Sequence, residues 1–420
     1  EYAPDGRVSE TIFAVRGTSP GIKVGTAIAL LTRADPHGEE AELLYRDMHE
    51  ARADDRRAAL LESLGASDFN SLYERLEPLP VLGYPFKPKN AGEEYLDWPK
   101  LPDLFPTYFP GVQSGRSSLV VDVDSDRLVG RIKQYFSPGV SHDEMAAICP
   151  QAMQTTRSFR ATRVREHLLK RGFLPEKIVH YFYRPFDLRW LYWEPETELL
   201  DRKRSDYFPQ VFEDNIWLVS EQKARRGYSP PQFTKRLGSR HLMEHGASCF
   251  PLYVKDLTLF GGADPQPQPN LSDEARAYLA QLARRETSEV SEDLGGLGSL
   301  AEDLFYHVLV ILHAPAYRDE NSGALRQDWP RVPLPAAAES LAASAELGRR
   351  VAALLDPEAE VAGVTSGVIR PDLRDVAVLR HVDGADRPLD PAAGEGVPGP
   401  RGHRDHAGPG GAGGAGRRRL

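Results

Sequence analysis

Arginine, lysine and glutamine side chains gather in the middle of this chain, where they could bind phosphates or the edges of bases. Residues 155–256 hold 19 Lys and Arg against 13 Asp and Glu, whereas the whole 420-residue chain has a net charge of −9. Basic side chains neutralise phosphates, arginine can donate two hydrogen bonds to guanine, and glutamine can pair with adenine. A nucleic-acid surface is therefore expected in this middle segment of an otherwise acidic protein.

Thirteen side chains are candidates for such contacts. Most of them stand beside segments with strand character and polar turns, an arrangement that can present side chains to a major groove. The candidates are Arg116, Arg184, Arg189, Arg202, Lys203, Arg204, Gln222, Lys223, Arg225, Arg226, Lys235, Arg236 and Arg240. Which of them would contact bases and which phosphates stays open, and a merely solvated basic face is the alternative interpretation.

The stretch 178–193 is dense in aromatic side chains, which a solvated loop would not concentrate. Its first residues predict a strand, which Pro185 ends or bends. Asp187 lies between Arg184 and Arg189, where it can hold at least one guanidinium in place. Two interpretations remain open: a core strand followed by a salt-bridged turn, or a rigid aromatic platform that directs arginines toward a planar or anionic partner.

Patterns for metal or covalent chemistry are weak in this sequence. The only cysteines are Cys149 and Cys249, and no Cys-x-x-Cys pair is present for zinc. The alternating aspartates of 122–126 resemble the start of a calcium loop, but Arg127 stands where such a loop needs glycine. We interpret them as exposed strand-end and helix-capping residues. The His-x-x-Glu-His pattern at 241–245 has no recognisable third ligand, so no catalytic, cofactor-binding or metal-binding residue is predicted.

Hydrophobic periodicity predicts a mixture of strands and helices that would position these side chains. Strands are predicted at residues 11–15, 22–31, 43–45, 118–121, 178–183, 216–220 and 250–254. Helices are predicted at residues 54–64, 143–149, 155–170, 272–287, 297–313 and 337–355. Residues 78–110 are rich in proline and aromatic anchors, as is typical of a linker and docking segment.

Several motifs resemble, in the same order, the specificity region of type ISP restriction–modification enzymes, which are single-chain restriction enzymes with a fused adenine-N6 DNA methyltransferase. The resemblance spans roughly residues 10 to 375. Its motifs are Gly21–Ala29, Gly111–Arg116, Tyr183–Tyr192, Phe250–Tyr253, Ile311–Arg318 and Trp329–Pro333.

The resemblance implies an α+β chain, and together with the local composition it divides the chain into four parts. Residues 1–65 would be the remnant of a Rossmann-like methyltransferase sheet, and residues 66–335 a mixed α/β target-recognition domain. Residues 336–383 would form a C-terminal helical extension. The tail 384–420 consists largely of Gly, Pro, Ala and Arg, which cannot bury a core, and is expected to be disordered.

The resemblance also implies a function, which is sequence-specific recognition of double-stranded DNA for an adenine-N6 methyltransferase with restriction endonuclease activity. The sequence holds neither the Asn-Pro-Pro-Tyr turn that grips a flipped adenine nor a glycine-rich cofactor loop. We therefore expect the chain alone to be inactive, with S-adenosylmethionine bound by the missing methyltransferase part and that catalytic half as a candidate partner. The alternative is a protein- or RNA-interaction module that uses the proline/aromatic segment and the basic middle.

The start of the chain and its composition bear on its expected cellular location. It starts at Glu1 without a charged and apolar leader, as expected of a fragment or a processed piece. No apolar run is long enough for a membrane span, so no membrane partner is expected. Two cysteines in 420 residues suit a reducing, cytoplasmic location.

Overall fold

The computed structural model describes residues 28–33, 35, 41–48, 52–68, 70–77, 79–80, 84, 86, 88, 91–224, 227–244, 246–257, 265–286 and 294–367. The candidates Arg225 and Arg226, the predicted strand 11–15 and the predicted disordered tail lie outside these residues. The chain divides into two compact units, Glu1–Ala359 and Glu360–Leu420. Every helix and strand named below belongs to the first unit. No described helix is long and apolar enough to cross a membrane.

A four-stranded antiparallel sheet lies between two hydrophobic cores. Its strand order is β3 (Phe109–Pro110), β10 (Ser248–Pro251), β7 (Trp217–Ser220) and β8 (Gln232–Thr234). In β7, Trp217 and Val219 belong to the first core and Leu218 to the second. Side chains alternate between the two faces of a strand, so both faces of this sheet are covered and all of β7 is buried.

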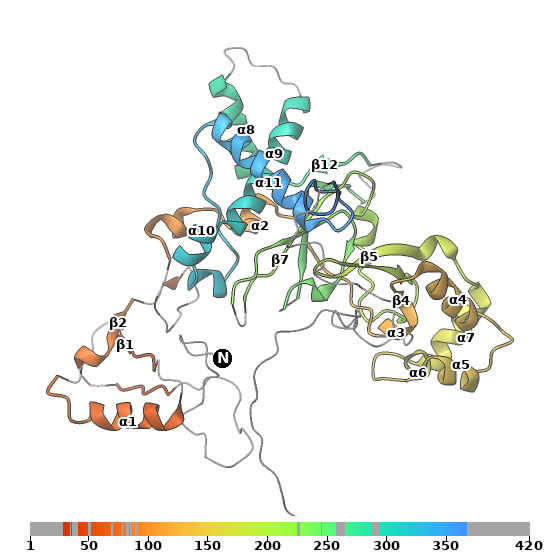
Figure 1. Ribbon diagram of the computed structural model, residues 1–420, viewed down its shortest axis with the longest axis horizontal. Helices are drawn as coiled ribbons and strands as arrows, with labels where there is room; N and C mark the ends of the chain where they lie inside the picture. Colours follow the sequence, from red (N-terminus) through yellow and green to blue (C-terminus); the bar gives the residue numbers. More distant parts are fainter. Residues whose placement is uncertain are drawn as a thin grey trace, which may run out of the picture. The chain divides into compact units, whose positions relative to one another are not determined.

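The first core contains a second four-stranded sheet and a group of short helices. The sheet order is β4 (Val121–Asp122), β6 (Asp187–Tyr192), β5 (Ile178–Arg184) and β9 (Leu237–Gly238). The helices are α4 (Ser125–Tyr135), α5 (His142–Ile148), α6 (Pro150–Met153) and α7 (Ala161–Arg171), which lie around β4 in Figure 1. Each of the four helices contributes a buried side chain to the first core, namely Leu128, Met145, Ala152 and Leu168.

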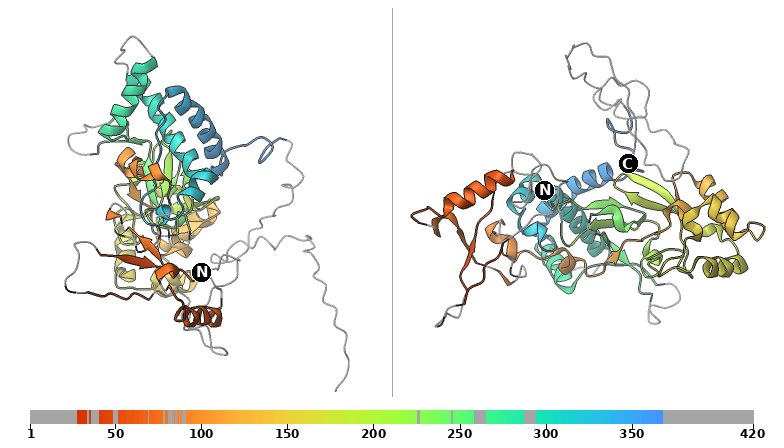
Figure 2. Two further views of the ribbon diagram at one scale, coloured as in Figure 1. Left: turned by 90° about the vertical axis from the view of Figure 1, so that its left-hand side faces the viewer. Right: turned by 90° about the horizontal axis from the view of Figure 1, so that it is seen from below.

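The second core is mainly helical. Its long helices are α8 (Asp273–Glu286), α9 (Leu294–His313) and α11 (Ala338–Leu355), which lie side by side in Figures 1 and 2. Gly348 of α11 is packed so closely on α9 that a Cβ there would lie 2.0 Å from the carbonyl oxygen of Tyr306. The first residues of the helical extension expected at 336–383 form α11, whose buried side chains belong to the second core.

Short elements connect these layers. The remaining helices are α1 (Ala53–Ser63), α2 (Leu101–Leu104), α3 (Ser117–Val120) and α10 (Pro315–Glu320). The 3-10 turns are η1 (Asn70–Leu72), η3 (Glu93–Asp97), η4 (Pro175–Lys177), η5 (Phe208–Gln210), η6 (Arg240–Leu242) and η7 (Ala324–Arg326). Two small antiparallel sheets pair β1 (Leu43–Tyr45) with β2 (Glu74–Leu76) and β11 (Tyr253–Val254) with β12 (Gln268–Pro269).

The structure confirms the predicted α+β mixture and leaves the methyltransferase remnant untested. The strand at 43–45 and the helix at 54–64 are present as β1 and α1. However, β1 pairs only with β2, and residues 28–31, the described end of the predicted strand 22–31, are not in a strand. One strand pair and one helix do not define a Rossmann-like sheet.

Three local predictions are wrong, because side-chain contacts or strand pairing override the local pattern. The strand expected at 118–121 is mostly the helix α3, where Ser118 donates both its N–H and its hydroxyl to Gln151. The helix expected from residue 155 begins only at α7, since the Thr155 side chain accepts the N–H of the first helical residue. The strand expected at 250–254 breaks at Leu252, where the chain changes its pairing partner from β7 to β12.

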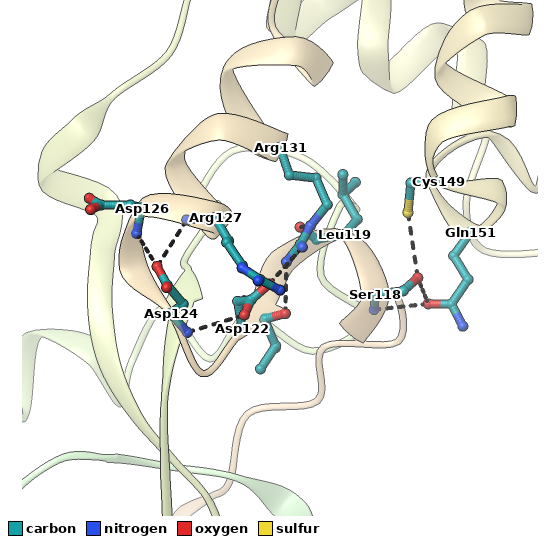
Figure 3. A network of polar contacts seen from close by, with 10 residues as sticks. Ser118, Leu119, Asp122, Asp124, Asp126, Arg127, Arg131, Cys149 and Gln151 are labelled. Carbon is teal, nitrogen blue, oxygen red and sulfur yellow. Dashed lines mark hydrogen bonds and ion pairs between the residues drawn. The ribbon is translucent and has the colours of Figure 1, made fainter. Parts of the chain in front are cut away.

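The three alternating aspartates organise the start of α4 (Figure 3). Asp124 caps the helix by accepting the N–H groups of Asp126 at 2.8 Å and Arg127 at 3.1 Å, which confirms its predicted capping role. Asp122 was expected to be exposed, but it is buried and bonded to Arg131 at 2.7 Å. No group of three metal-ligating side chains occurs among the described residues.

Candidate nucleic-acid interface

The strand register brings several loops to one end of the central sheet. Ser248 of β10 is paired with Pro110 of β3 on one side and with Ser220 of β7 on the other. The segments after β3 and β7 and the segment before β10 therefore emerge at the same end, and neighbouring strands are only about 4.8 Å apart. The exposed candidates Gln222 and Lys223 follow β7 directly.

The parallel pair β5 and β9 brings two further candidates to this end. Phe182 is opposite Gly238, so Arg184, the last residue of β5, and Arg240, just beyond β9, leave the second sheet in the same direction. The backbone of Arg240 then joins the two sheets. Its N–H donates to Val112 at 2.8 Å, and its carbonyl accepts the N–H of Ala247 at 2.8 Å.

Two glycines in the Gly111–Arg116 motif allow this close packing. A Cβ on Gly111 would lie 2.4 Å from the backbone nitrogen of Arg240. Gly115 has a φ of +66°, and a Cβ on it would lie 2.3 Å from the carboxyl group of Asp201. Close packing thus requires glycine at position 111, and close packing together with a left-handed backbone requires it at position 115.

The same motif does not offer its first N–H groups to a phosphate. Gly111, Val112 and Gln113 donate to the carbonyls of Ala247, Gly238 and Arg202, at 3.0, 2.9 and 3.0 Å. Of the two roles open to this loop, a phosphate-binding backbone and a structural turn, the structure supports the turn. It positions the arginines that follow or face it.

Five side chains at this end form a group that we call the basic cluster: Arg184, Arg202, Arg204, Arg240 and His241. Burial lowers the pKa of Arg204, and the charges of Arg240 and Arg202 lower it further against the opposing effect of Asp206. Burial likewise lowers the pKa of His241, and Arg184 and Arg240 add to the effect. Arg240 thus lies within electrostatic reach of both Arg204 and His241, and it links Arg202 on one side to Arg184 on the other.

The arginines of the basic cluster form no salt bridge within the described part of the chain, although the charge of Asp206 acts on Arg204. No carboxylate there forms a salt bridge with Arg184, Arg202, Arg204 or Arg240. Arg204 also has a φ of +55°, a conformation that is uncommon for a residue with a side chain. Strain of this kind concentrates at functional sites, and unneutralised positive charge attracts anions.

The hairpin of β5 and β6 holds one arginine and leaves another free. The Tyr183 ring carries two guanidinium groups near its face, those of Arg184 at 4.6 Å and Arg189 at 4.3 Å from its centroid. Asp187 binds Arg189 through contacts of 2.8 to 3.0 Å, which confirms that it holds a guanidinium in place. Arg189 is thus neutralised, while Arg184 remains part of the basic cluster.

Arg116 has a structural role, and its place among the candidates is corrected here. The residue is only 4% exposed. Its guanidinium donates to the carbonyls of Leu199 and Glu198 at 2.7 Å and to Asp201 at 2.9 Å, and it lies 3.8 Å from the centroid of the Phe159 ring. Burial and these contacts leave the guanidinium little surface for a phosphate or base to reach.

Lys235 and Arg236 lie away from the basic cluster. They follow β8, whose last residue pairs with Trp217 at the start of β7, so they leave the sheet at its opposite end. Both are neutralised near the end of α11, Lys235 by Asp356 at 3.1 Å and Arg236 by Glu358 at 2.6 Å. These two are not available for DNA in this structure.

Two further candidates, Gln222 and Lys203, each form one hydrogen bond within the protein. Gln222 donates to Asp328 at 3.0 Å in an exposed contact that a ligand can replace. The carbonyl of Lys203 accepts the indole N–H of Trp193 at 2.6 Å, which holds the segment that carries Arg202 and Arg204. Our sequence candidates did not include His241, although its position beside Arg240 was a usable signal.

Fold and site together define a class of protein: an α+β module that presents unneutralised basic loops at one end of a buried sheet. The chain belongs to the type ISP C-terminal specificity domain family, whose model matches residues 103–367, more than half of the chain. None of the curated proteins compared with it matches.

Solved structures resemble this chain at low sequence identity. A DrdV–DNA complex is 21% identical with a TM-score of 0.51, over 80% of this chain and 34% of the matched chain. The type ISP enzyme LlaBIII bound to DNA is 16% identical with a TM-score of 0.51, over 79% of this chain and 21% of LlaBIII. A nuclease-deletion mutant of LlaGI with a DNA substrate mimic is 18% identical, with a TM-score of 0.49, over 76% of this chain and 28% of that one. The chain thus spans about a third or less of each relative.

Proposed function

We propose that this chain is the specificity part of a type ISP restriction–modification enzyme and that it binds double-stranded DNA through the basic cluster. The observation that carries the proposal is the convergence of four arginines from distant segments, without salt bridges, at one end of the central sheet. Family membership and the DNA named in the solved relatives support it.

The basic cluster would bind the DNA phosphates, and the loop after β7 would contact the bases. Arginines that converge from several loops suit the phosphates of a duplex, whose neutralisation supplies most of the salt-dependent affinity. Gln222 and Lys223 are exposed at the same sheet end and carry groups that can address base edges. We propose that these two residues contribute to sequence selection.

The chemistry of the parent enzyme is also part of the proposal. It would be an adenine-N6 DNA methyltransferase with restriction endonuclease activity, and residues 1–65 would be the end of its methyltransferase domain. S-adenosylmethionine would bind to the catalytic half. Since the sequence contains no Asn-Pro-Pro-Tyr turn and no glycine-rich cofactor loop, we assign no step of methyl transfer to this chain.

Electrophoretic mobility shifts with 30-base-pair duplexes of random sequence test the proposal. Arg240→Ala should weaken binding about tenfold and lower the slope of log affinity against log salt by about 0.9, the contribution of one phosphate. Arg236→Ala is the matched control, since its guanidinium is neutralised at the opposite sheet end, and it should bind like the wild type. Equal losses for the two variants, or a folded wild type that binds no duplex at low salt, would contradict the proposal.

A further inference from the structure

Phe186 stands at the tip of the hairpin formed by β5 and β6. Arg184 and Asp187 are paired across this hairpin, which leaves Pro185 and Phe186 as a two-residue loop. The Phe186 side chain is 62% exposed although its immediate surroundings are rich in buried aromatic residues. The ring of Phe186 is thus in contact with water, whereas neighbouring rings such as those of Tyr181 and Phe182 are buried.

The backbone at this tip is as unusual as the exposure. Phe186 has a φ of +61°, and a proline followed by a positive φ is the combination of a type II turn, where glycine or asparagine is the normal choice. Among the described residues, only Tyr84 is a second aromatic with a positive φ, and much of the chain around Tyr84 is not described. Neither packing nor turn chemistry accounts for a phenylalanine at position 186.

The stem below the tip is rigid. In β5 the guanidinium of Arg184 lies over the ring of Tyr183, and in β6 Asp187 forms a salt bridge with Arg189. The loop therefore holds the Phe186 ring in a preset direction, which lowers the entropy lost when the ring meets a partner. Arg184 is a member of the basic cluster and stands two positions before Phe186, so the ring adjoins the surface proposed to bind phosphates.

We propose that Phe186 is a wedge that inserts between neighbouring base pairs of the bound duplex and unstacks them. This inference rests on the proposed function and extends it from binding to distortion of the DNA. Apolar side chains inserted at a base step unstack it and bend the duplex, while the flanking cations hold the backbone. Stacking on a base also buries the ring, whichever base is present, since every base has a flat aromatic face.

Competition between an intact duplex and the same duplex with a central T·T mismatch tests the wedge. A mismatched step is easier to unstack, so the wild type should prefer the mismatched duplex by about fivefold or more. Phe186→Asn is the test variant, because asparagine tolerates the left-handed backbone and preserves the turn. Its preference should fall to about one while its salt dependence stays that of the wild type.

A 2-aminopurine placed beside the mismatch gives an independent readout. Wild-type binding should raise its fluorescence, Phe186→Leu should retain most of the rise, and Phe186→Asn should lose it. A wild type that binds DNA but shows no mismatch preference, or an Asn variant that keeps it, overturns the wedge and leaves the proposed function intact. A folded wild type that binds neither duplex overturns both.

Discussion

Arginine residues in this chain differ in function because their guanidinium groups have different neighbours. Arg116 is enclosed by carbonyls, a carboxylate and an aromatic ring, whereas Arg202 is exposed and without a salt bridge in the described structure. A buried guanidinium that binds carbonyls and a carboxylate stabilises the fold, and an exposed one remains available for a ligand. Residue type alone does not separate these roles.

Replacing Arg116 should therefore affect folding first. Arg116→Ala leaves buried carbonyls and Asp201 without their donor, and should lower the free energy of unfolding by about 3–5 kcal/mol. Arg116→Lys should not restore it, since an ammonium cannot reproduce the planar donor geometry. Urea denaturation measures the effect. Arg202→Ala is the control and should change stability by less than about 0.5 kcal/mol.

The strain at Phe186 has a consequence for stability that is separate from DNA binding. Phe186→Gly relieves a left-handed backbone that costs about 1–2 kcal/mol for a residue with a Cβ, and some of this is lost again to glycine's greater unfolded-state freedom. We expect the variant to be more stable than the wild type by about 0.5–1 kcal/mol. Phe186→Ala keeps the strain and should show no gain in thermal or urea denaturation, whereas equal gains would argue against strain.

His241 should make DNA affinity depend on pH. Burial and the nearby Arg184 and Arg240 lower its pKa in the free protein, so it is neutral at pH 7. A DNA phosphate would raise that pKa, so binding takes up a proton and affinity should rise about three- to tenfold as pH falls from 7.5 to 6. His241→Gln should flatten this rise in fluorescence anisotropy titrations. His167→Gln, an exposed control, should keep it.

At the scale of elements, short loops decide where the arginines lie. The backbone of the Gly111–Arg116 segment bonds to three neighbouring segments, through Arg202, Gly238 and Ala247. It thereby holds the segment carrying Arg202 and Arg204 against the one carrying Arg240. A substitution in this loop should therefore displace the arginines of the basic cluster, even if it leaves every charge unchanged.

Gly111→Ala tests that dependence. Its Cβ would overlap the backbone of Arg240 at 2.4 Å, and backbone cannot yield as a flexible side chain can. We expect a loss of at least about 2 kcal/mol in stability and a clear loss of DNA affinity in the molecules that remain folded. Gly130→Ala is the matched control: nothing lies near its Cβ inside α4, and it should gain about 0.5–1 kcal/mol.

At the scale of the whole first unit, the two hydrophobic cores share a single sheet. β10 places Cys249 in the first core and Phe250 in the second, just as β7 divides its side chains. Loss of either core exposes one face of this sheet and removes support from the other. The two cores should therefore unfold together.

Leu309→Ala, a truncation in the second core, measures this coupling. Leu309 is fully buried, so the change should cost about 2–5 kcal/mol. The intrinsic fluorescence of the tryptophans, which include Trp193 in the first core, and far-UV circular dichroism should shift together to lower denaturant. The transition should stay single. Because tryptophans lie in both cores, a second, unshifted transition in the fluorescence would show that the cores are independent.

Sequence patterns predicted the elements with strong local signals. The helices at 272–287, 297–313 and 337–355 match α8, α9 and α11 within a few residues, because their apolar spacing repeats over several turns. The strands at 178–183 and 216–220 match β5 and β7, whose aromatic and β-branched content is high. The short helix α3 was not predictable in this way, because its four residues read locally as a strand and its contacts with Gln151 come from another helix.

The sequence by itself determined that the chain is an α+β protein of the type ISP specificity family with an excess of basic residues in its middle. Only the tertiary structure decided which of those residues are available. Arg116, Arg236 and Arg240 look alike in the sequence, yet the first is buried, the second is neutralised by a residue 122 positions away and the third joins the basic cluster. The physical reason is that a charge depends on its neighbours in space, and strand register and chain crossings set those neighbours, which local residue patterns do not encode.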